Sequence, residues 1–245
     1  MKFQNQDTIE TSALKINNKL EPTIWDNEYL INEKIRQNLL NIAKLFIKTL
    51  KLKPDTEISD IIITGSIANY NWTKHSDVDV HIVIDFSKIN IPNQELIKEY
   101  FNAKKENFNT KYDFKIKGHD VEMYVQDVNE IHHATGIYSL LKDKWIRIPK
   151  KNLVIIDRNS IMKKATYIMK YVDNLHLSDP DLLQKIEKIK DKIKLMRQCG
   201  LENTGEYSVE NLVFKILRNN GYLEKLNNLK EKKLEKELSV ESKQI

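Results

Sequence analysis

The sequence predicts an α+β fold, in which a mixed β-sheet with flanking helices is followed by an all-helical domain. Two segments, residues 78–84 and 116–125, alternate apolar and polar residues as half-buried strands do. A long segment before them has apolar residues at helical spacing, and only helical patterns follow Pro149. We therefore expect a weakly ordered segment over residues 1–24, a sheet-containing domain over residues 25–150 and a helical domain over residues 151–245.

The first expected helix follows Asp26, whose carboxylate can accept hydrogen bonds from the first turn. Its apolar residues recur every three or four positions, which predicts one buried face. They are Leu30, Ile31, Ile35, Leu39, Ala43, Phe46 and Leu50. An apolar strand at Ile61-Ile62-Ile63 comes next and ends in a turn at Gly65-Ser66.

A second helix is expected from Asn93 to Lys105, between the two alternating strands. The segments 138–141 and 145–148, joined by a short polar turn, predict a β-hairpin.

In the helical domain, Asp179-Pro180 begins a helix by capping and by the fixed φ of proline. Gly200 is expected to end that helix. Another helix is predicted between Ser208 and Gly221.

Composition limits where the protein acts and what it binds. The one cysteine, Cys199, excludes an internal disulfide framework and favours a reducing compartment. No apolar run reaches membrane-spanning length, and the first residues lack a signal-peptide core. We therefore expect a cytoplasmic protein without a membrane partner. The formal net charge of +5 suits an anionic nucleotide or nucleic acid.

Asp77 and Asp79 belong to one face of the strand at residues 78–84. Alternate side chains of a strand share a face, about 6.5 to 7 Å apart. Two close carboxylates repel each other, so a divalent cation is their natural compensation. Because both offer only oxygen ligands, Mg²⁺ or Mn²⁺ is favoured over zinc.

Gly65-Ser66, followed after ten residues by Asp77-x-Asp79, resembles the signature of the DNA polymerase β-type nucleotidyltransferase superfamily. That group includes tailing enzymes for RNA, tRNA 3′-end enzymes, oligoadenylate and cyclic-dinucleotide synthases, antibiotic nucleotidyltransferases and some toxins. The resemblance covers about residues 25–130 and implies the nucleotidyltransferase fold for the sheet. The segments 63–76 and 205–212 also resemble uncharacterised nucleotidyltransferase-like proteins of large bacteriophages, which brings no known substrate.

The resemblance implies that Gly65 and Ser66 hold the triphosphate of a nucleoside triphosphate. Glycine permits close backbone approach, and exposed N–H and hydroxyl groups donate to anionic oxygens. Lys74 lies in the loop between this turn and the aspartates, where contact with the nucleotide is expected.

The superfamily also uses a third carboxylate on a neighbouring strand. Alternation in residues 116–125 puts Asp120 and Glu122 on one face, so the two compete for this role. The superfamily's third acid usually stands between apolar residues, which fits Glu122 better. The resemblance thus implies Asp77, Asp79 and Glu122 as catalytic residues and as ligands of two Mg²⁺ or Mn²⁺ ions.

Arg197, Lys215 and Arg218 are candidates for binding phosphate or the acceptor. Each lies on a predicted helix beside the Gly205-Glu206-Tyr207 loop, which the bacteriophage resemblance also marks.

These residues lead us to expect a metal-dependent enzyme that transfers a nucleoside monophosphate to an acceptor hydroxyl and releases pyrophosphate. The basic charge favours RNA or tRNA as the acceptor. A small antibiotic-like molecule or a protein, as in some toxins, is an alternative acceptor. A catalytically silent nucleotide-binding module is the other alternative.

Overall fold

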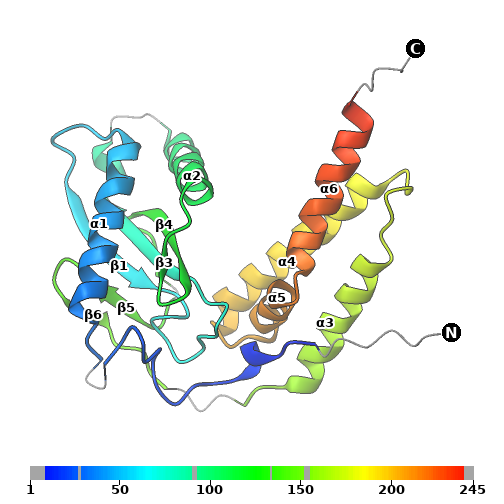
Figure 1. Ribbon diagram of the computed structural model, residues 1–245, viewed down its shortest axis with the longest axis horizontal. Coiled ribbons are helices and arrows are strands. Elements are labelled where there is room, and N and C mark those ends of the chain that lie inside the picture. The colour runs from blue at the N-terminus through cyan, green and yellow to red at the C-terminus, as the bar shows by residue number, and fades with distance from the viewer. Residues whose placement is uncertain (1–8, 27–28, 90–92, 133, 152–154, 240–245) are drawn as a thin grey trace. The chain divides into compact units, whose positions relative to one another are not determined.

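The computed structural model describes residues 9–26, 29–89, 93–132, 134–151 and 155–239. It consists of two compact units, which we call the sheet unit (Lys15–Asn152) and the helical unit (Met1–Leu14 with Leu153–Ile245). Figure 1 shows the strands and helices of both and labels them except for β2. The sheet with its flanking helices, followed by further helices, confirms the predicted α+β fold class.

The sheet has six strands in the order β3-β4-β2-β1-β5-β6. They are β1 (Ile58–Thr64), β2 (Val78–Ile84), β3 (Lys115–Ile116), β4 (His119–Asp127), β5 (Ile137–Ser139) and β6 (Lys144–Arg147). β2 and β4 run parallel, while the other neighbours pair antiparallel, so the sheet is mixed. β5 and β6 form the predicted hairpin.

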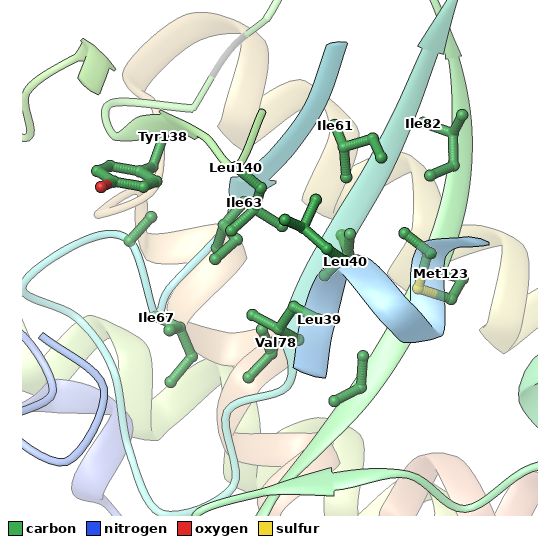
Figure 2. Close-up of a cluster of buried hydrophobic side chains, with 14 of the residues drawn as sticks. Leu39, Leu40, Ile61, Ile63, Ile67, Val78, Ile82, Met123, Tyr138 and Leu140 are labelled. Carbon is green, nitrogen blue, oxygen red and sulfur yellow. The ribbon is translucent and has the colours of Figure 1, made fainter. Parts of the chain in front are cut away.

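Two helices, α1 (Glu33–Leu50) and α2 (Gln94–Lys111), pack on one face of the sheet. Alternation along β2 explains the packing, because its even-numbered residues are fully buried while Asp79 and His81 are half-buried on the other face. A slip of one residue would bury the carboxylate, so the register is strongly specified. Figure 2 shows α1 side chains meeting strand side chains in this core. The labelled residues are Leu39, Leu40, Ile61, Ile63, Ile67, Val78, Ile82, Met123, Tyr138 and Leu140.

α1 begins later than the sequence indicated. Asn32 caps it, because its side chain accepts hydrogen bonds from the backbone N–H groups of Lys34 and Ile35. Asp26 instead accepts from the N–H of Leu30, 2.8 Å away, and so closes a loop. Of the two apolar residues before the cap, Ile31 is buried from a loop, whereas Leu30 is exposed and does not belong to the predicted buried face. Helical periodicity does not distinguish such a loop from a first turn.

The segment before α1 has defined contacts in its described part, although the sequence indicated weak order over residues 1–24. A short 3-10 helix, Ser12–Leu14, contributes to the core of the helical unit. In the sheet unit, Trp25 stacks on Trp145 at 4.8 Å and donates from Nε1 to the carbonyl of Ile67. These buried residues have no regular spacing, so periodicity gives no signal for them. Residues 1–8 lie outside the described residues.

The helical unit contains α3 (Arg158–Asp173), α4 (Leu182–Thr204), α5 (Val209–Asn219) and α6 (Tyr222–Leu238). Their apolar faces form a second hydrophobic core. Ser208 caps α5 as predicted, because its side chain accepts a hydrogen bond from the N–H of Asn211. None of the described helices in either unit is long and apolar enough to cross a membrane.

α4 differs from the prediction at both ends. It begins at Leu182, after Asp181, and continues through Gly200 to Thr204. Gly205, with φ of 80°, ends it instead. Gly200 has a packing role, since an added Cβ would lie 2.7 Å from Ser208 Oγ and 2.7 Å from Glu210 Cβ.

We predict that Gly200→Ala lowers the free energy of unfolding. Alanine favours a helix over glycine by up to about 1 kcal/mol, but overpacking costs about 1 to 3 kcal/mol. The clash outweighs the gain, so we expect a net loss of about 1 kcal/mol in urea denaturation. Lys194→Ala, at an exposed position of the same helix, is the neutral control. A stability gain in Gly200→Ala would contradict the close packing of α4 on the start of α5.

Candidate active site

The parallel pairing of β2 with β4 brings two of the predicted carboxylates together. Asp79 is in register with Glu122, and His81 with Tyr124. Side chains in register on neighbouring strands share a face, here the one opposite α1 and α2. Asp77 lies just before β2, and all three carboxylate residues are partly accessible to solvent. The site therefore occupies the polar face of the sheet.

The register separates the two candidates for the third acid. Glu122 lies beside Asp79, whereas Asp120 pairs with Lys115 of the edge strand β3 and forms an ion pair with it. Asp120 is the largest cause that raises the pKa of Lys115, followed by Asp113. Glu122 thus has the better position for joining the aspartates.

The Gly-Ser turn lies directly against the carboxylates. Gly65 follows β1 with φ of 77°, and a Cβ added to it would overlap Oδ2 of Asp79. Glycine is therefore required here both by the backbone conformation and by the close approach.

Ser66 is tied to the same place, because its hydroxyl donates to Oγ of the buried Ser76 at 2.8 Å. The backbone N–H of Thr73 also donates to that oxygen, at 2.9 Å.

Two residues that sequence reasoning missed complete this arrangement. The carbonyl of Ser76 accepts a hydrogen bond from Nδ1 of buried His119, at 2.7 Å. His119 begins β4, so the bond links the end of the loop to the strand that carries Glu122. Ser76 belongs to the segment 63–76 quoted above, but His119 belongs to no recognisable motif, and the link between them depends on tertiary pairing.

The predicted basic residues fall in two places. Lys74 is exposed in the loop of the sheet unit that holds Ser66 and Ser76. Arg197, Lys215 and Arg218 belong to α4 and α5, hence to the helical unit. The guanidinium of Arg197 lies 4.1 Å from the centre of the Phe214 ring, and its Nε donates to Asn211 Oδ1.

The donor set suits a hard divalent cation, because Asp79 and Glu122 offer only oxygen on one face and Asp77, just before β2, offers the same kind of ligand. In the part of the chain that the structure describes, no three or more histidine, cysteine, aspartate or glutamate side chains are already arranged to hold a metal. Oε2 of Glu122 already accepts a hydrogen bond from the Tyr124 hydroxyl.

Tyr124 keeps its proton beside these acids. Burial is the largest cause that raises the pKa of its hydroxyl above the ordinary value, followed by the charges of Asp79 and Glu122. The Tyr124 ring stacks on that of His81, with centroids 4.8 Å apart. Nζ of Lys105 lies 4.9 Å from the Tyr124 ring centre.

His81 is a neutral member of the same face. Burial is the main cause that lowers its pKa to about 4, and the charges of His132 and Lys105 act in the same direction. Its hydrogen bond to Gln126 Oε1, at 2.8 Å, opposes the shift without reversing it. The amide of buried Gln126 in turn donates to the His132 ring.

We predict that protonation of His81 destabilises the protein at mildly acidic pH. In the unfolded chain its pKa is about 6.5, so the unfolded state binds more protons between about pH 6.5 and pH 4. His81 alone should lower the free energy of unfolding by about 2 kcal/mol between about pH 7.5 and about pH 5. Urea denaturation of wild type and His81→Asn at both pH values measures this, and equal pH dependence of the two proteins would contradict the assignment.

Comparison with known proteins finds a family model that matches the part of the chain containing these residues. Residues 41–135 match the family model described as the nucleotidyltransferase domain, a range that contains Gly65, Ser66, Asp77, Asp79 and Glu122. No curated protein matches the chain.

Among solved structures, a spectinomycin adenyltransferase from Enterococcus faecialis, crystallised with ATP and spectinomycin, is 17% identical to this chain. The match covers 84% of this chain and 92% of that one, with a TM-score of 0.27, at which no conclusion about this chain follows. None of these matches tests the resemblance to bacteriophage proteins, which stays a prediction. The match over residues 41–135 confirms the predicted enzyme class, a nucleotidyltransferase.

Proposed function

We propose that the protein is a metal-dependent enzyme that transfers a nucleoside monophosphate from a nucleoside triphosphate to an acceptor hydroxyl and releases pyrophosphate. One observation carries the proposal. The parallel register sets Asp79 beside Glu122, while Gly65 brings the phosphate-binding turn against the Asp79 carboxylate. In this proposal the phosphate groups of the nucleotide therefore lie next to the carboxylates that bind its metal ions.

Each residue has a role in this proposal. Gly65 and Ser66 present a backbone N–H and a hydroxyl to phosphate oxygens. Asp77, just before β2, and Asp79, on β2, would hold two Mg²⁺ or Mn²⁺ ions, and Glu122 on β4 would help to hold one of them. When bound, such ions neutralise charge on the transferred phosphoryl group and make the acceptor hydroxyl easier to deprotonate.

RNA or tRNA is the acceptor that we propose first, because the net charge of +5 favours a polyanion. A small antibiotic-like molecule or a protein would use the same nucleotide site, since the residues named above act only on the nucleotide and its ions. The experiment below separates these acceptors.

The direct test incubates the full chain with each α-labelled nucleoside triphosphate, Mg²⁺ or Mn²⁺, and one acceptor pool at a time. The pools are total RNA, a set of hydroxylated antibiotics, and a protein extract. Label in RNA supports the acceptor proposed first, and label in another pool replaces it. Nucleotide binding without label in any pool would favour a silent module and overturn the proposal.

We predict that the double variant Asp77→Asn, Asp79→Asn loses nucleotidyl transfer by about three orders of magnitude or more. Asparagine keeps the size but not the charge of the ligands, so the melting temperature should stay near that of wild type. Asp120→Asn is the matched control, because Asp120 lies on β4 but pairs with Lys115. Undiminished turnover in the double variant would contradict the proposal. A loss in Asp120→Asn as large as in Glu122→Gln would move the third role to Asp120.

We also predict that the helical unit contributes to nucleotide binding. Replacing Arg197, Lys215 or Arg218 with methionine should raise KM for the nucleotide by about tenfold each, the effect of losing a charge-assisted hydrogen bond. Steady-state kinetics against nucleotide concentration measure this, with exposed Lys188→Met as the control. An unaltered KM in all three variants would refute the assignment.

A further inference from the structure

A supported row of side chains continues from the third carboxylate along the polar face of the sheet. The Tyr124 hydroxyl donates to Oε2 of Glu122, two residues earlier on β4. The Tyr124 ring stacks on His81 of β2 with an angle of 25° between the planes. His81 is held by buried Gln126, whose amide donates to His132.

We propose that Tyr124 is a positioning residue for the third carboxylate. Its hydroxyl holds Glu122 by Oε2, so that Oε1 serves a divalent cation shared with Asp79. This inference rests on the proposed function, because it assigns Glu122 to the metal.

The chemistry of the donor suits this role. The phenol is neutral, so it orients Glu122 without cancelling the negative charge that attracts a cation. Lys115 does the opposite to Asp120, because its ammonium group compensates that charge.

Support is needed most at Glu122, since a glutamate has more rotamer freedom to lose than an aspartate when it becomes a ligand. Asp79 has other constraints, as it lies between Thr64 and Glu122 in the sheet with Gly65 against its carboxylate. Groups that orient metal ligands typically change metal affinity by about 10- to 100-fold.

The test measures the affinity of the full chain for Mn²⁺ without nucleotide, from the electron paramagnetic resonance signal of free Mn²⁺. Tyr124→Phe removes the hydroxyl but keeps the ring that stacks on His81 and contacts Lys105. We expect its Mn²⁺ affinity to fall by about 10- to 100-fold with little change in melting temperature. Tyr100→Phe, which removes a hydroxyl bonded to the carbonyl of Leu50, is the control with unchanged affinity.

Glu122→Gln separates failure of this inference from failure of the metal assignment. We expect it to weaken Mn²⁺ binding, and Tyr124→Phe to add no further loss in that background, because the two act as one unit. Weakening by Glu122→Gln with unchanged or tighter binding in Tyr124→Phe would overturn the positioning role alone. Unchanged binding in Glu122→Gln would overturn the metal role of Glu122 as well. The wider proposed function is tested separately, by the labelling experiment and by the turnover of Asp77→Asn, Asp79→Asn.

A second variant tests the inference without changing Tyr124. Glu122→Asp keeps the charge but shortens the side chain, which withdraws the carboxylate from the Tyr124 hydroxyl. Its Mn²⁺ affinity should fall by a similar factor, and an unchanged affinity would count against the positioning role.

Discussion

The parallel pairing of β2 with β4 is the constraint on which the candidate site depends. These strands are not consecutive in the chain, and α2 lies between them, so only tertiary packing sets their register. Burial of the apolar face of β2 under α1 and α2 determines which residues face the helices. The same register leaves Asp79 and Glu122 side by side on the opposite face. The hydrophobic core and the carboxylate pair are therefore two results of one alignment.

Periodicity in the sequence was sufficient for the strands that alternate strictly. It placed Asp79 opposite the buried residues of β2, and it predicted the hairpin of β5 and β6. It failed where packing is irregular. Trp25 is buried from a loop, and Gly200 lies inside a helix because a neighbouring segment leaves no room for a Cβ. Such positions depend on neighbours distant in sequence, which a local pattern does not contain.

For the candidate site, local sequence narrowed the third acid to two residues but did not decide between them. Asp120 and Glu122 share a face, so alternation treats them alike. Glu122 is in register with Asp79 of β2, whereas Asp120 is in register with Lys115 of β3. Only this pairing between strands distinguishes the two acids. The support of Glu122 by Tyr124 was also invisible, because stacking on His81 crosses from β4 to β2.

Gly65 makes two parts of the site inseparable. Its missing side chain is the space that Oδ2 of Asp79 occupies, so the Gly65-Ser66 turn and the strand that carries Asp79 share one volume. Any larger residue at this position would disturb both at once. Substitutions that leave both the turn and the Asp79 carboxylate in place are therefore confined to positions away from this contact.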